Sequence, residues 1–174
     1  MNEGLCCAIF GHSPMRFAWG FDEEDEGCRA LKLELLQLIL ELRLQGVTRF
    51  AVVCDCGIGL YAGEMVNHLR ETDEAIQLYC VTPHEGQATK WAPYLRERYF
   101  TLLERCTIME VISPQKTSTC QEEAYRKIID YADVVVMVYD KESARGDVID
   151  SAVSYAVKQP RRIICIRPDT LLRI

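Results

Sequence analysis

Several short loops of this sequence carry small and polar residues of the kinds that bind a phosphate-containing ligand. The clearest reads Asp55-Cys56-Gly57-Ile58-Gly59 and directly precedes a stretch with helical character. Glycines at such a position allow backbone N–H groups to approach a phosphate at the N-terminus of the helix. A tight turn from a strand into a helix also favours glycine, so a purely structural role is an equally weighted alternative.

Similar polar residues follow the other apolar runs. The candidate binding residues are Gly11, His12, Ser13, Arg16, Asp55, Gly57, Gly59, His84, Arg145, Gly146 and Asp147. Several polar loops directed at one edge of a fold are a stronger signal than any single loop. We therefore predict that Gly11, His12, Gly57, Glu85 and Gly146 line one cleft. The alternative is that these residues serve only as turn residues, and His12 and His84 could each cap a turn instead of contacting a ligand.

Apolar runs that read as buried strands alternate with amphipathic stretches that read as helices. The expected strands cover residues 5–10, 50–54, 76–81, 108–112, 134–139 and 163–166. The first expected helix opens with the acidic residues 22–26 and closes at Gly46, and the later helices cover about 60–70, 91–105, 121–131 and 148–157. Strands that are apolar throughout indicate a parallel sheet covered on both faces. The sequence predicts one domain over residues 1–174, an α/β fold with a doubly wound, mainly parallel Rossmann-like sheet. In such folds ligands bind outside the carboxyl ends of the strands.

Composition narrows the classes of function. The 174 residues are 49% hydrophobic and 26% charged, with a formal net charge of −6, which is typical of a globular protein and argues against a nucleic-acid binder. No apolar run is long enough to span a membrane, and the N-terminus lacks the pattern of a signal peptide. Nine cysteines without disulfide-framework spacing indicate a reducing, cytoplasmic location. We expect no cofactor and no metal, because Cys54 and Cys56 have no second pair at zinc spacing.

The same loops resemble those of a known superfamily. The segments that carry the resemblance include 8–14, 22–27, 46–50, 61–64, 83–87, 130–133, 138–140 and 153–156. Over nearly the whole chain, the sequence resembles the SLOG superfamily of SMF/DprA-type and Lonely-Guy-type Rossmann-like domains, and is most similar to its YpsA-like branch. The resemblance implies a nucleotide-ligand pocket at the strand ends. Members of the superfamily include hydrolases of the N-glycosidic bond of nucleoside monophosphates and DNA-binding proteins.

Departures from that family pattern remove phosphate-binding groups. Ser13 stands where the branch usually has arginine, and Gly59 stands where it usually has aspartate. An Arg-Asn pair is replaced by Ala124-Tyr125, and a Gly-Gly-Thr loop is replaced near Arg145-Gly146-Asp147. Losing a cation and gaining a carboxylate makes the pocket less favourable for a phosphate dianion.

Three functions remain after this comparison. The first is a module that binds a nucleotide derivative, as a sensor or regulator, without turnover. The second is a hydrolase of a nucleotide N-glycosidic bond, in which Glu64 or Glu85 would stabilise an oxocarbenium-like centre and Arg16 or Arg145 would hold phosphate. The third is a non-catalytic scaffold that acts through protein contacts, for which a homodimer is one form. The lost phosphate-binding groups favour the first function.

Overall fold

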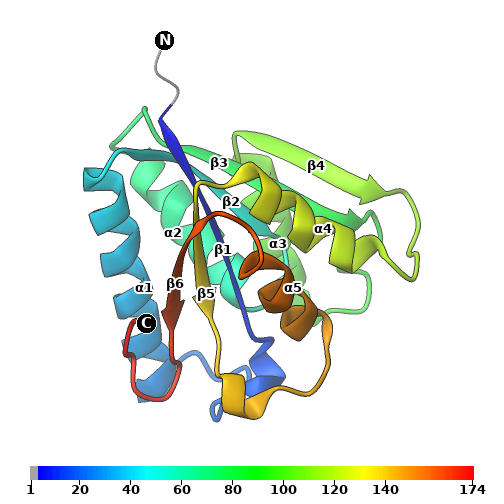
Figure 1. Ribbon diagram of the computed structural model, residues 1–174. Coiled ribbons are helices and arrows are strands. Elements are labelled where there is room, and N and C mark those ends of the chain that lie inside the picture. The colour runs from blue at the N-terminus through cyan, green and yellow to red at the C-terminus, as the bar shows by residue number, and fades with distance from the viewer. Residues whose placement is uncertain (1–3) are drawn as a thin grey trace.

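The computed structural model describes residues 4–174 and contains one six-stranded sheet in the order β4-β3-β2-β1-β5-β6 (Figure 1). Every pair of neighbouring strands is parallel, which confirms the predicted parallel α/β fold. The strands are β1 (Leu5–Gly11), β2 (Val47–Val53), β3 (Gln77–His84), β4 (Ile108–Ser113), β5 (Val134–Val138) and β6 (Arg162–Ile166). The helices are α1 (Glu26–Leu44), α2 (Ile58–Arg70), α3 (Pro93–Arg105), α4 (Cys120–Tyr131) and α5 (Val148–Ala156), with short 3-10 turns η1 (Pro14–Arg16) and η2 (Lys141–Ser143).

Helices cover both faces of the sheet, as expected for a doubly wound fold. The core on one face contains residues of α1, α2 and α3, and the core on the other contains residues of α4 and α5 (Figure 1). The neighbouring residues Cys6 and Cys7 of β1 belong to opposite cores, because successive side chains of a strand point to opposite faces. Strand β5 is buried along its whole length between β1 and β6, as its five consecutive apolar residues predict.

Helix α1 shows how local sequence fixes the elements. The Asp25 side chain accepts a hydrogen bond of 2.7 Å from the Gly27 N–H and so caps the first turn. Leu31, Leu35 and Leu42 recur at helical spacing, and all three are fully buried against the sheet. The acidic segment that opens this region therefore starts the helix, while its leucine stripe fixes which face packs on the sheet.

Strand β3 extends further than its apolar run predicts. We expected Thr82, Pro83 and His84 in a loop, but they complete β3. The edge strand β4 accounts for the extension, because Thr82 pairs with Val111 and His84 pairs with Ser113 in the ladder. The start of the third loop therefore lies about three residues later in the chain than the apolar pattern indicates.

The last segment of the chain folds back along the edge strand β6. Cys165 and Ile174 exchange two backbone hydrogen bonds of 2.9 and 2.8 Å, and Arg173 forms an antiparallel bridge with Ile166. The Arg173 guanidinium also lies 2.5 Å from carboxylate oxygens of both Glu34 and Glu41 on α1. This tail is therefore held by both the sheet and a helix. Within residues 4–174, no helix is both long and apolar enough to cross a membrane.

Candidate functional site

A cleft of about 380 Å³ opens at the carboxyl edge of the sheet. It lies beside the end of β1, where the strand order switches from β2 on one side to β5 on the other. Such a switch point is where open α/β sheets bind ligands. Five of the predicted binding residues line this strand-end cleft, namely Gly11, Ser13, Asp55, His84 and Asp147.

Other lining residues were not among the predicted binding residues. They are Pro14, Cys56, Gln87, Trp91, Lys116, Gln121, Tyr125, Val148 and Ile149. Trp91 supplies a broad aromatic surface and is held in place by an edge-on contact with Tyr99, at 5.2 Å between ring centroids and 72° between ring planes. Its position directly after the polar loop 83–89 was a usable signal. The signal for Tyr125 was its position, with Ala124, where the family pattern has an Arg-Asn pair.

The Asp55 carboxylate occupies the N-terminus of α2, where the glycine loop was expected to bind a phosphate. One carboxylate oxygen, Oδ1, accepts hydrogen bonds from the N–H groups of Gly57 at 2.9 Å and of Gly59 at 3.0 Å. The other oxygen, Oδ2, accepts the Tyr125 hydroxyl at 2.9 Å. Burial raises the pKa of Asp55, and the three hydrogen bonds oppose that rise by stabilising the ionised form. The first turn of α2 is thus bound to a carboxylate of the chain itself.

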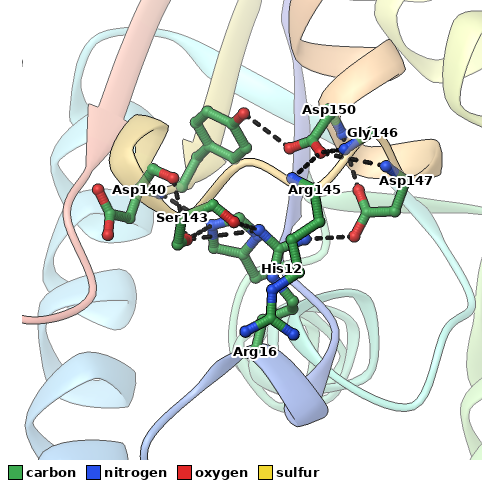
Figure 2. Close-up of polar contacts among 9 residues, drawn as sticks. His12, Arg16, Asp140, Ser143, Arg145, Gly146, Asp147 and Asp150 are labelled. Atoms are coloured by element: carbon green, nitrogen blue, oxygen red, sulfur yellow. Dashed lines mark hydrogen bonds and ion pairs between the residues drawn. The ribbon is translucent and has the colours of Figure 1, made fainter.

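The backbone N–H groups of the loop before α5 are also bound by a carboxylate of the chain. Asp150 Oδ2 accepts the backbone N–H groups of Arg145, Gly146 and Asp147 (Figure 2). Asp147 Oδ1 accepts the N–H of Asp150 at 3.0 Å, which completes a capping box at the start of α5. The reciprocal spacing of two acidic residues could have predicted this capping box, but sequence reasoning missed Asp150.

Arg16 is bound to the same loop. Its side chain is only 5% exposed, and Nη1 lies 2.5 Å from Asp147 Oδ2, while Nη2 donates to the Ser143 carbonyl (Figure 2). His12, 1% exposed, accepts the Asp140 N–H at Nε2 over 2.9 Å. Burial lowers the pKa of His12, and the nearby Arg16 charge lowers it further, so the imidazole is neutral. His12 and Arg16 lie outside the lining of the cleft and hold the loop between β5 and α5 in place.

The two predicted catalytic carboxylates lie outside the cleft lining. Glu64 faces a separate hollow between α2 and α3, where Arg98 donates to it at 2.8 and 3.0 Å. Arg98 also pairs with Glu23 at 2.5 Å, so one guanidinium joins two carboxylates. Glu85 is exposed and lines an apolar groove between α3 and β4. The structure therefore does not bring either glutamate to the strand-end cleft.

The remaining predicted residues form the support of the cleft or its outer rim. Gly57 and Gly59 are absent from the lining, and a β-carbon on Gly57 would lie 2.9 Å from the Pro14 ring. Gly146 adopts a φ of +73°, which favours glycine, and lines a different hollow beside α4. Arg145 is exposed. Of the five residues expected to line one cleft, Gly11 does so, whereas His12, Gly57, Glu85 and Gly146 do not.

Cys56, the cysteine of the cleft lining, does not suit nucleophilic chemistry. All nine are free thiols, six of them buried. Cys56 lines the cleft, but burial and the nearby Asp55 carboxylate raise its pKa to about 11, which leaves little thiolate at neutral pH. No group of three or more His, Cys, Asp or Glu within residues 4–174 is arranged to hold a metal ion.

Comparison with known proteins identifies the family of the chain. The chain is 27% identical over 155 residues to a UPF0398 protein of Halalkalibacterium halodurans, covering 87% of this chain and 82% of that protein. It is 24% identical over 155 residues to a UPF0398 protein of Bacillus pumilus, covering 87% and 79%. A UPF0398 protein of Staphylococcus aureus is 20% identical over 124 residues, covering 70% and 66%. The model of the YpsA family, described as the YspA SLOG family, matches residues 7–171. The chain belongs to this YpsA SLOG family.

Proposed function

We propose that this protein binds a small nucleotide-derived ligand in the strand-end cleft and acts as a sensor or regulator without turning the ligand over. The observation that carries the proposal is the composition of the cleft. At about 380 Å³ it has the size of a small-molecule site, and it combines the Trp91 ring with side chains that can exchange hydrogen bonds with a ligand, such as Gln121 and His84. The carboxylates expected to perform catalysis lie elsewhere. Nine free thiols support a cytoplasmic location for this role.

Replacing Trp91 tests ligand binding. In wild-type protein, at least one of adenosine, guanosine, cytidine, uridine and their 5′-monophosphates should raise the melting temperature and bind in isothermal titration calorimetry. Trp91→Ala should weaken that binding by about tenfold or more, because stacking of a base on an aromatic ring contributes about 1–3 kcal/mol. Trp91→Phe should keep most of the affinity.

A control separates this effect from loss of folding. Trp91 also packs against the core, so the melting temperature of each variant without ligand is measured first. Phe100→Ala is a suitable control, since Phe100 is 56% exposed and lines the separate groove beside β4. Equal binding by wild type and a folded Trp91→Ala variant would contradict the proposed site.

Efficient hydrolysis of nucleoside monophosphates is not expected. That reaction requires an anchored phosphate and a carboxylate at the ribose, because remote binding energy orients the reacting centre. Glu64 is held by Arg98, Arg16 is held by Asp147, and Glu85 faces another groove. Release of free base from purine and pyrimidine monophosphates should stay at the uncatalysed rate. Turnover that disappears in both Glu64→Ala and Arg145→Ala would instead favour the hydrolase.

A further inference from the structure

We infer that the strand-end cleft takes its ligand without a phosphate, as a nucleoside rather than as a nucleotide. The inference rests on the proposed function and narrows its ligand class. It follows from how the chain uses the groups that would otherwise hold a phosphate: the N-termini of two helices and one buried arginine.

The first of these groups is the N-terminus of α2. A phosphate bound at a helix N-terminus accepts hydrogen bonds from backbone N–H groups of the first turn. Here Asp55 Oδ1 already accepts the N–H groups of Gly57 and Gly59, at 2.9 and 3.0 Å. Asp55 also lines the cleft, so a phosphate would have to displace a carboxylate that the Tyr125 hydroxyl holds from its other side.

The second group is the N-terminus of α5, where Asp147 lines the cleft while Gly146 and Asp150 line the neighbouring hollow beside α4. Three consecutive backbone N–H groups, from Arg145 to Asp147, converge there on one point, which is the arrangement of an anion-binding nest. That point is occupied by Asp150 Oδ2, whose carboxylate also accepts the Tyr139 hydroxyl at 2.7 Å. Burial alone would raise the pKa of Asp150, but these hydrogen bonds outweigh burial and lower it, so the occupying group is an anion.

The third group is Arg16, whose side chain is only 5% exposed. Its charge is compensated by Asp147, 2.5 Å from Nη1, and Nη2 donates to Ser143, while Nε has no hydrogen-bond partner among the described residues. The cleft therefore presents the carboxylates of Asp55 and Asp147 together with the ammonium of Lys116 at an exposed position. This balance of charge disfavours a dianion.

The other lining groups suit a neutral heterocycle. The Trp91 ring can stack on a base, and the amide of Gln121 and the imidazole of His84 can exchange hydrogen bonds with its edge or with ribose hydroxyls. The Gln87 amide nitrogen donates to the Cys54 carbonyl, so Gln87 offers the ligand its amide oxygen as an acceptor. Val148 and Ile149 at the start of α5 add an apolar surface to the cleft. The cleft thus offers the contacts for base and sugar, while its anion sites are filled internally.

The test compares each nucleoside with its own 5′-monophosphate by isothermal titration calorimetry at low salt. Any nucleoside that binds should bind at least about tenfold more tightly than its monophosphate. This difference in affinity should become smaller at high salt, because salt screens the repulsion between the phosphate and the carboxylates of the cleft. Asp147→Asn should strengthen monophosphate binding about tenfold, since Asn still caps α5 while Arg16 loses its counter-charge. Glu74→Gln removes one exposed carboxylate just before β3, at the amino ends of the strands and away from the cleft. This control should leave the ratio of nucleoside to monophosphate affinity unchanged.

The possible outcomes separate this inference from the proposed function. A wild-type protein that binds a monophosphate as tightly as its nucleoside, or more tightly, overturns the inference and leaves the proposed function standing. Binding of neither compound in any pair overturns both. A preference for the nucleoside that is unchanged in Asp147→Asn contradicts the assignment of phosphate exclusion to the carboxylates of the cleft. A preference that Asp147→Asn reduces and Glu74→Gln does not is the expected result.

Discussion

Gly59→Ala is expected to lower the free energy of unfolding by about 3 kcal/mol, at the upper end of the usual cost of overpacking. A β-carbon at this position would lie 1.9 Å from the carbonyl oxygen of Val53 and 3.1 Å from its carbonyl carbon. Both are backbone atoms at the end of β2, so no side-chain rotation relieves the overlap. The first turn of α2 would have to move away from the sheet and from the Asp55 carboxylate that caps it.

Gly86→Ala is the matched control for this variant. A β-carbon on Gly86 would have its nearest neighbour at 3.5 Å, an ordinary van der Waals distance. Urea denaturation should therefore give nearly wild-type stability for Gly86→Ala, while Gly59→Ala should melt lower by several degrees, at about 2–4 °C per kcal/mol for a domain of this size. Equal melting temperatures for the two variants would show that α2 adjusts at little cost.

The second large effect is expected for Asp55→Ala, which should also destabilise the protein by about 3 kcal/mol. Loss of the cap of a helix costs about 1 kcal/mol, and a buried hydroxyl left without a partner costs about 1–3 kcal/mol. Both losses occur here, because one carboxylate serves the N–H groups of Gly57 and Gly59 and the hydroxyl of Tyr125, which is 5% exposed.

Two conservative variants divide this effect into its parts. Asp55→Asn keeps an oxygen for the N–H groups of the helix and should cost much less than Asp55→Ala. Tyr125→Phe removes only the contact with the hydroxyl, and the double variant with Asp55→Ala should lose little beyond Asp55→Ala alone, because the shared hydrogen bond is already absent. Fully additive costs in this double-mutant cycle would mean that the hydrogen bond contributes nothing to stability.

The fold was predictable because buried strands and helices show characteristic patterns of apolar residues in the sequence. A strand buried on both faces reads as an unbroken apolar run, as in Val134–Val138, and each predicted strand and helix has its counterpart in the structure. The boundaries were less predictable. β3 continues through Pro83 to His84 because a neighbouring edge strand pairs with it, and that partner lies about 30 residues away in the chain.

The site was only partly predictable, for a related reason. Residues at or just beyond the end of a strand, such as Gly11 and Asp55, reach the cleft because the end of the strand fixes their position. The state of a charged side chain depends on distant partners instead. Arg16 reads as a phosphate ligand until Asp147, 131 residues later, is seen beside it, and Glu64 reads as a catalytic group until Arg98 is seen beside it. Such pairings leave no local pattern in the sequence.

The tail that returns along β6 makes the two edges of the sheet unequal as surfaces for assembly. An open edge strand presents unpaired backbone groups that can add a strand from another chain. At β6 a foreign strand would first have to displace the segment ending at Ile174 and break the contacts of Arg173 with α1. At the other edge, Ile108 and Met109 of β4 are about half exposed, at 49% and 51%. The β4 edge is therefore the one at which a strand from another chain could add without displacing part of this chain.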